Sequence, residues 1–336
     1  AGVGQTQGIQ KYSIALCVVG DSREDIMSES ASTDSPKVSI GLAVYNGETF
    51  LAEAIESILA QTYRDFELII SDNASTDQTA QICQKYAAQD KRIRYHRNKT
   101  NIGGANNENL TLTMAKGKYV RLAAHDDKCA PELLQRTVDV LEANPDVVLC
   151  YTATNLIDES GKLLDVSKLG KGTAKNPYQR FKELIFRDHF CESTYGLIRT
   201  ETLRKIELQK NYIDSDRIFL GRLALHGRFY EIPEPLFYKR LHSKNQYLDW
   251  RARMAWFNPS WKGKISFPHW LELLDIISTI RQAPLSKSEK LRCYLVTVLW
   301  LIIYAKNMAK DIFIALWKVI HSSRWRSNDS HVYNWE

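Results

Sequence analysis

Three apolar runs in the first half of the chain each end in polar residues that could do chemistry. Val38–Tyr45 leads into Asn46 and Gly47, Phe66–Ser71 into Asp72, and Tyr119–Ala124 into His125, Asp126 and Asp127. Each run precedes a helix-like segment, so we expect parallel strands whose carboxyl ends meet at one edge of a sheet. Open α/β sheets bind their ligands at that edge. A lone aspartate at one strand end and an aspartate pair at another suit a nucleobase contact and a metal–diphosphate contact.

Asp72 can accept a hydrogen bond from a ring N–H of a nucleobase, which uracil, thymine and guanine all offer. The alternative is that Asp72 only closes the turn before the next helix. Asp77 is the better N-cap of that helix, which we predict to run through Tyr86. We therefore favour a nucleotide-binding role for Asp72.

Asp126 and Asp127 are adjacent, so in an extended stretch their side chains point in opposite directions. One can reach a divalent cation while the other holds the loop or the sugar. Mg²⁺ or Mn²⁺ is often held by one or two carboxylates together with substrate phosphates. The alternative is that the pair stabilises the N-terminus of a helix that begins near Pro131.

The periodicity of the chain predicts elements that would position these residues. Further strands are expected at Phe66–Ile70, Ile93–Tyr95, Val147–Tyr151 and Leu236–Arg240, with a hairpin at Ile157–Leu164. Helices are expected at Phe50–Leu59, Gly103–Ala115, Pro131 through Leu141, and Ile218–Leu225. The pattern indicates an α/β fold with a mostly parallel, Rossmann-like sheet flanked by helices.

Composition narrows the class of protein. The 336 residues are 44% hydrophobic and 25% charged, and the net charge of +6 is mild. The half of the chain that carries the strand-end residues mixes basic and acidic residues, while the C-terminal region looks more basic, and we expect no nucleic-acid partner. The six cysteines are scattered without a Cys-x-x-Cys pair, which favours a reducing, cytoplasmic location. Residues 1–36 stand outside the pattern, and we expect an extension that is disordered or artificially added.

The order of these motifs resembles the inverting family 2 glycosyltransferases, which have the GT-A fold. The resemblance runs from Lys37 to about Gln246 and rests on several stretches in order. They are Val38–Ile40, Val44–Gly47, Ser57–Thr62, Ile70–Asp77, Asn101–Gly104, His125–Asp127, Pro131–Glu132, Ser215–Arg217 and Tyr238–His242. We therefore expect a GT-A catalytic domain at 37–246 and a helical C-terminal appendage at 247–336.

The resemblance implies an enzyme that transfers a sugar from a UDP, dTDP or GDP sugar, with inversion, to a saccharide or lipid-linked acceptor, as in polysaccharide biosynthesis. It implies Asp216 as the catalytic base, with Asp214 as the nearby competitor. It implies nucleotide contacts and a site for Mn²⁺ or Mg²⁺. The nucleotide-binding residues would be Ala43, Tyr45, Asn46, Asp72, Asn73, Gly104 and Asp126, and the metal ligands Asp126 and His242, with Asp127 in support.

One position departs from the family pattern. The family commonly shows Asp-x-Asp-Asp after the fourth strand, and Ala124 stands at the first of these positions. This departure supports an alternative function, a non-catalytic sugar-nucleotide-binding or scaffold protein of the same fold. A nucleotidyltransferase is disfavoured, because Asn46-Gly47-Glu48 is neither glycine-rich nor basic.

The C-terminal segment has a different character. Apolar residues recur at helical spacing over Leu291–Ile320, and Lys306, Lys310 and Asp311 interrupt them, so a spanning helix is not available. Tryptophans and basic residues beside an apolar face suit a helix on an anionic membrane surface, which would place the protein on the inner face of the cell membrane. A contact with the catalytic domain or with a second subunit, giving a homodimer, is the open alternative.

Overall fold

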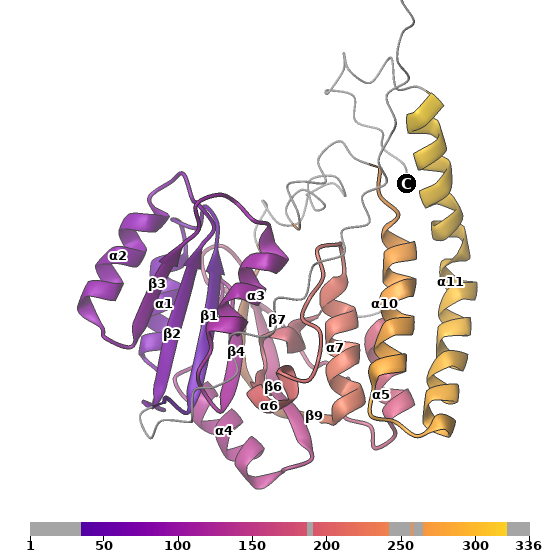
Figure 1. Ribbon diagram of the computed structural model, residues 1–336. Helices are drawn as coiled ribbons and strands as arrows, with labels where there is room; N and C mark the ends of the chain where they lie inside the picture. The colour runs from indigo at the N-terminus through magenta and orange to yellow at the C-terminus, as the bar shows by residue number, and fades with distance from the viewer. Residues whose placement is uncertain (1–34, 187–190, 242–256, 258–264, 321–336) are drawn as a thin grey trace, which may run out of the picture. The chain divides into compact units, whose positions relative to one another are not determined.

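The computed structural model describes residues 35–186, 191–241, 257 and 265–320, and its main feature is a mixed β-sheet with helices on both faces (Figure 1). All of these except Ser35 belong to a single unit, 36–336. The expectation for the N-terminal extension and the prediction for His242 lie outside the described residues.

The sheet has the order β3-β2-β1-β4-β8-β6-β9-β5, with β7 paired to β6. The first four strands are parallel, so their carboxyl ends share one edge, while β8 runs antiparallel to β4 and β6. The strands are β1 Val38–Val44, β2 Phe66–Asp72, β3 Ile93–Arg97, β4 Tyr119–Ala123, β5 Lys128–Cys129, β6 Val147–Ile157, β7 Leu163–Ser167, β8 Leu197–Arg199 and β9 Arg228–Arg240.

Two apolar cores fix helices to the two faces of this sheet. One joins it to α1 Leu51–Leu59, α2 Thr79–Gln89 and α4 Leu133–Ala143. The other joins it to α3 Gly104–Met114, α6 Thr200–Leu203 and α7 Ser215–His226. The helix α3 packs very closely on β1, because a Cβ atom at Gly41 would meet Thr111 Oγ1 at 2.2 Å. The predicted α/β class is confirmed.

A third core joins the C-terminal helices to the rest of this unit. It holds α5 Pro177–Ile185, α7, α10 Pro268–Gln282 and α11 Lys287–Ile320 together. Trp300 of α11 is fully buried there, next to Tyr304 with ring centroids 4.8 Å apart. Within the described part of the chain, no helix combines the length and the apolar character that a membrane crossing requires.

The structure extends the predicted elements in several places. The last strand begins at Arg228 and not at Leu236, and it contains Pro233 and Pro235. Its pairing with β6 shifts register next to these prolines, which lack the N–H that a regular ladder needs. The helices α5 and α10 and the short 3₁₀ helix η1, Glu192–Tyr195, are additional to the prediction.

Candidate active site

Asp72 lies at the end of β2 with none of its surface exposed. Its Oδ1 accepts the Ser75 backbone N–H at 2.8 Å, and its Oδ2 accepts the Tyr95 hydroxyl at 3.0 Å. The Arg97 guanidinium lies 3.6 Å from Oδ2. Burial, together with this carboxylate, raises the pKa of Tyr95. The carboxylate therefore closes the turn and is held in a fixed orientation, with lone pairs in addition to the two that these donors occupy.

The turn after Asp72 is joined to its neighbours by side-chain amides. Asn73 donates to Asn101 Oδ1 at 2.9 Å and to the Gly103 carbonyl at 3.3 Å, and its own Oδ1 accepts the Ile102 N–H at 2.9 Å. Gly103 has a φ of 89°, a left-handed conformation that glycine adopts at little cost. These bonds place the start of α3, and with it Gly104, beside the Asp72 turn.

The end of β1 is tied to the same turn. Asn46 has a positive φ of 51°, donates its N–H to Ser75 Oγ at 3.0 Å and accepts the Thr76 N–H at 2.8 Å. Ala43 pairs in register with Ser71, and the Tyr45 side chain is 39% exposed. The structure therefore brings Ala43, Tyr45, Asn46, Asp72, Asn73 and Gly104 to one edge of the sheet.

Asp77, the predicted N-cap of α2, lies one residue before the observed N-cap. The N-cap of this helix is Gln78, but the Asp77 carboxylate accepts the backbone N–H groups of Thr79 at 3.0 Å and Glu48 at 3.1 Å. Burial opposes ionisation of Asp77, and the hydrogen bonds outweigh it, so that the pKa of this carboxyl is lowered. Asp77 thus links the loop after β1 to the start of α2.

Asp126 and Asp127 are both buried after the end of β4, and β5 separates them from α4. Arg240, the last residue of β9, binds both aspartates. Its backbone N–H donates to Asp127 Oδ1 at 2.8 Å, and its Nε donates to the backbone carbonyl of Asp126 at 2.9 Å. The same guanidinium binds Glu53 of α1 at 2.5 Å. Burial and the Asp126 charge raise the pKa of Asp127 to about 8.

Asp216 lies in the first turn of α7 and accepts the Arg217 N–H at 2.9 Å. Asp214, two residues before Asp216, is the N-cap of α7 and has a left-handed φ of 65°. Burial and the Asp214 charge raise the pKa of Asp216. A carboxylate with a raised pKa is a stronger base, so this environment suits a residue that takes up a proton.

Tyr195 lies where the acidic residues converge. Burial raises its pKa, and so do the charges of Asp127, Glu108, Asp126 and Asp216. Burial and the charge of Asp216 also raise the pKa of Glu108, to about 8. Asp126, Asp127, Asp216 and Glu108 therefore each act electrostatically on Tyr195, a residue that sequence reasoning did not single out.

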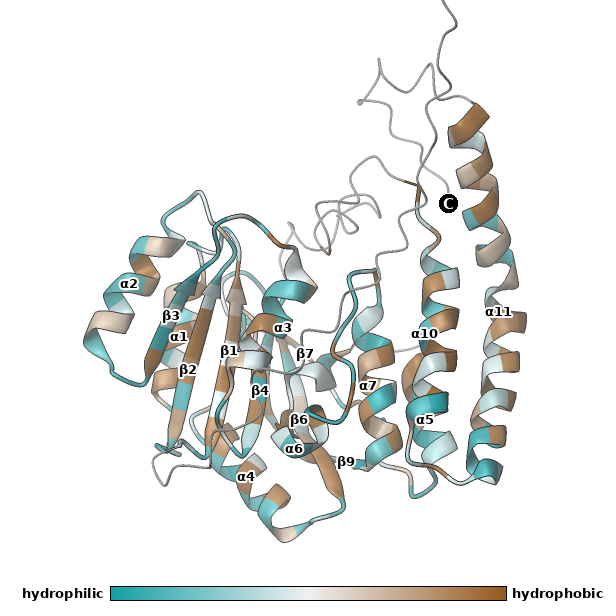
Figure 2. Cartoon of the chain, in the orientation of Figure 1, coloured by the Kyte–Doolittle hydropathy of each residue, from teal (hydrophilic) through white to brown (hydrophobic). Residues whose placement is uncertain are grey.

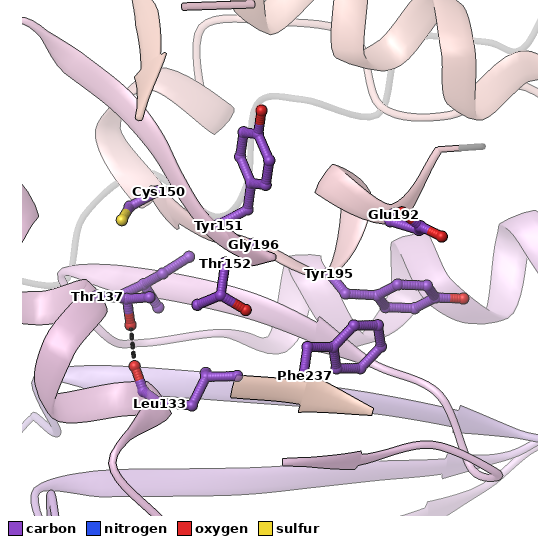
Figure 3. Close-up of a pocket in the computed structure, with 10 residues that line it drawn as sticks. Leu133, Thr137, Cys150, Tyr151, Thr152, Glu192, Tyr195, Gly196 and Phe237 are labelled. Atoms are coloured by element: carbon purple, nitrogen blue, oxygen red, sulfur yellow. Dashed lines mark hydrogen bonds between the residues drawn. The ribbon is translucent and has the colours of Figure 1, made fainter. Parts of the chain in front are cut away.

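Figure 3 shows a small cavity that is a separate feature. Leu133, Thr137 and Cys150 line one part of it, and Tyr195 and Phe237 lie over another, with their ring centroids 5.3 Å apart. None of the aspartates predicted for the site lines this cavity. Tyr195, which lines this cavity, is also the residue on which the charges of the nearby acidic side chains act.

Asp126 and Asp127 are adjacent buried carboxylates, and carboxylate oxygens are ligands that Mg²⁺ and Mn²⁺ accept. The described residues contain no group of three or more histidine, cysteine or acidic side chains that could hold a metal ion. Mg²⁺ and Mn²⁺ accept fewer protein ligands when substrate phosphates complete the shell. Asp126 and Asp127 therefore fit a site that is finished by the substrate.

Sequence reasoning missed Glu108, Tyr195 and Arg240. Glu108 could have been found in the polar run Asn106–Asn109, which is unusual in the middle of a helix that covers a sheet. Arg121 has the residue type of a surface charge, but it is buried. It is 1% exposed in the middle of β4, with its guanidinium 5.5 Å from the centre of the Phe237 ring.

Comparisons with known proteins agree with this geometry. The sequence model of glycosyl transferase family 2 matches residues 39–207. An uncharacterized glycosyltransferase of Methanocaldococcus jannaschii is 30% identical over 219 residues, which are 64% of this chain and 74% of that protein. The glycosyltransferase GlyG of Streptococcus pneumoniae is 33% identical over 116 residues, 34% of this chain and 38% of that protein.

Among solved structures, residues 1–349 of TarS from S. aureus in complex with UDP give a TM-score of 0.57 at 19% identity, covering 76% of this chain and 68% of that one. The complex of TarS with UDP-GlcNAc gives 0.54 at 18% identity, with 88% and 93% covered. At this identity the likeness establishes the fold, which is the predicted GT-A fold.

Proposed function

Because the chain belongs to glycosyl transferase family 2, we propose that it transfers a sugar, with inversion, from a nucleoside-diphosphate sugar to a saccharide or lipid-linked acceptor. The observation that carries the proposal is the buried pair Asp126 and Asp127 after β4, which Arg240 holds at the same carboxyl edge of the parallel strands that carries Asp72. TarS, which has the same fold, has been crystallised with UDP and UDP-GlcNAc, which supports a nucleotide-sugar donor.

The donor nucleotide would bind at the carboxyl ends of β1 and β2. Asp72 would accept the ring N–H of the base, and Asn73 with the start of α3 would shape the neighbouring wall. Uracil, thymine and guanine all present such an N–H, so UDP, dTDP and GDP sugars are the candidates.

Asp126 would hold Mn²⁺ or Mg²⁺ together with the diphosphate, with Asp127 in support and His242 as a further ligand. When bound, the cation would neutralise charge on the leaving diphosphate. Arg240 positions the two aspartates by binding the Asp126 carbonyl and the Asp127 carboxylate at the same time.

Asp216 would be the general base. In a direct displacement, the acceptor hydroxyl loses its proton as its oxygen bonds to the anomeric carbon, and the nucleoside diphosphate leaves from the opposite face. Burial beside Asp214 raises the pKa of Asp216 and strengthens it for this task. Since the base must be ionised, transfer should fall as the pH falls through that raised pKa.

A screen of UDP, dTDP and GDP sugars tests the proposal, with thermal shift and donor hydrolysis measured with and without Mn²⁺. We expect one nucleotide class to stabilise the chain and to be turned over only with the cation. Asp126→Ala should abolish this turnover, and full activity of that variant with chelator present would contradict the metal role.

The alternative is a non-catalytic sugar-nucleotide-binding protein, which Ala124 favours because it lacks the usual first carboxylate. It predicts donor binding in calorimetry without turnover on any acceptor. It also predicts that Asp216→Asn changes nothing measurable.

A further inference from the structure

We propose that the outer face of α11 docks on an anionic lipid surface. This apolar face is a series of residues three or four positions apart, which places them on one side of a helix, and Lys306 and Lys310 interrupt it between Ile302 and Phe313. Its large members include Leu291, Leu295, Ile302, Phe313, Leu316 and Ile320. The inference concerns an interaction surface and stands independently of the transfer reaction.

The apolar face points away from the interior of this unit. Ile302 is 70% exposed, Phe313 68% and Ile320 73%, whereas Trp300 on the other side of the helix is completely buried. The inner side already packs on α10 and α5 in the third core. The outer side is therefore additional to what the fold of this unit needs.

The exposed apolar surface is concentrated here. In the part of the chain that the structure describes, every strongly exposed large hydrophobic side chain lies within 265–320, apart from Tyr45, Leu163, Leu164 and Val166. Figure 2 shows hydrophobic residues along the length of α11. From Leu291 to Ile320 the apolar face extends over roughly 45 Å. Patches of this kind mark contacts with a partner or a membrane.

The charge around the apolar face is basic. Arg281, Lys287, Arg292, Lys306 and Lys310 are exposed. The acidic residues of α10 and α11 are mostly withdrawn from the surface, since Glu272, Asp275 and Asp311 are buried. Glu289 accepts hydrogen bonds from the Ser286 N–H and hydroxyl at the start of α11. An incoming surface therefore meets apolar groups and positive charge.

This charge distribution favours an anionic membrane over a second copy of the chain. In a two-fold dimer the same patch meets itself, so lysines would face lysines, while in the described part of α10 and α11 the carboxylates of Glu272, Asp275 and Asp311 are buried and cannot pair with them. Lys306 and Lys310 follow Ile302 at four-residue spacing and lie within the apolar stripe, between Ile302 and Phe313. Their long stems can bury while the ammonium groups reach lipid phosphates. A helix with this pattern lies in the plane of the membrane interface.

Flotation of the full chain tests the proposal with phosphatidylcholine vesicles that do or do not contain phosphatidylglycerol. We expect flotation with the anionic vesicles at low salt and its loss at high salt, because salt screens the lysines. Lys306→Gln with Lys310→Gln should weaken partitioning roughly 25-fold, about fivefold for each lysine. Lys85→Gln with Lys91→Gln, on α2 and the loop after it, is the matched charge control.

The apolar contribution is tested with Ile302→Ser plus Phe313→Ser, which changes two exposed positions and should lower partitioning at least about tenfold. Leu163→Ser plus Leu164→Ser, both 54% exposed on β7, is the matched control and should float like the unchanged chain. Light scattering of the same samples gives the oligomeric state. A dimer that the α11 variant converts to a monomer would overturn the proposal, and so would a chain that fails to float with anionic vesicles at low salt.

Donor binding, measured on the same proteins, keeps the two proposals apart. Loss of flotation with intact donor binding rejects only the membrane surface. Flotation without donor turnover rejects only the proposed reaction.

Discussion

The two halves of the candidate site differ in how completely the protein balances its own charges. At the end of β2, hydrogen bonds from Ser75 and Tyr95 and the nearby Arg97 satisfy the Asp72 carboxylate. Around Tyr195, Asp127 and Glu108 have pKa values raised to about 8, because burial and neighbouring carboxylates disfavour their ionised forms. The first half is organised before any ligand arrives, whereas the second favours protons or a cation.

This difference assigns separate tasks to the two halves. A rigid carboxylate that keeps one orientation suits recognition, because binding costs it little reorganisation. A cluster of buried carboxylates suits chemistry, because its pKa values are shifted toward the pH at which protons are exchanged. Variants in the two halves should therefore change different measured quantities.

The largest expected effect is on the rate of transfer, in Asp216→Asn. The amide keeps the shape of the side chain but cannot take the proton of the acceptor, so the transfer rate should fall by ~10²–10⁴. Donor affinity, measured by calorimetry, should stay within about twofold. Asp214→Asn is the matched control and should retain most of the rate. If the loss appears in Asp214→Asn and not in Asp216→Asn, the two roles are exchanged.

The next effect is on donor affinity, in Asp72→Asn. The loss of one hydrogen bond to a charged acceptor costs ~1.5–3 kcal/mol, which weakens binding roughly tenfold to over a hundredfold. The rate at saturating donor should change little. Asp77→Asn is the control, because Asp77 also binds backbone N–H groups of this loop. An equal loss of affinity in both variants would mean that Asp72 only holds the turn.

The sequence predicted the first half of the site better than the second, for a physical reason. Asn46 and Asp72 stand at the ends of apolar strands, and parallel strands bring their carboxyl ends together whatever else the chain does. Glu108 and Tyr195 reach the site from the middle of a helix and from a short 3₁₀ helix that the antiparallel strand β8 follows. The polar run Asn106–Asn109 marks Glu108 as unusual without assigning it to the site, and no local pattern marks Tyr195. The packing of α3 and η1 on β4, and of η1 on α7, positions these residues.

Some elements around the site also depend on tertiary packing and not on local sequence pattern. The prolines of β9 obscured the first part of a strand that reaches the site at Arg240, since a register shift against β6 accommodates them. Arg121 has the residue type of a surface charge, because arginine is mostly exposed, yet β4 lies between two other strands with helices on both faces of the sheet. Strand ends could be predicted from local pattern, whereas these contacts depend on the assembled sheet.

The smallest expected effect is on stability and sharpens the contrast in charge balance. Glu108 has a folded pKa of about 8 against an ordinary 4.5. As the pH rises between these values, the unfolded chain releases this proton while the folded chain retains it, so unfolding becomes more favourable. Glu108→Gln removes that linkage, and its Tm should exceed that of the unchanged chain by roughly 2–5 °C at pH 8 and by less at pH 5.

Glu142→Gln is the control with the opposite pH dependence, because Lys37 and Lys118 lower the pKa of Glu142 to about 2. This variant should lose stability at neutral pH, and the loss should shrink as the pH falls toward 2. Parallel Tm curves for Glu108→Gln and the unchanged chain from pH 5 to pH 8 would show that Glu108 is an ordinary ionised side chain.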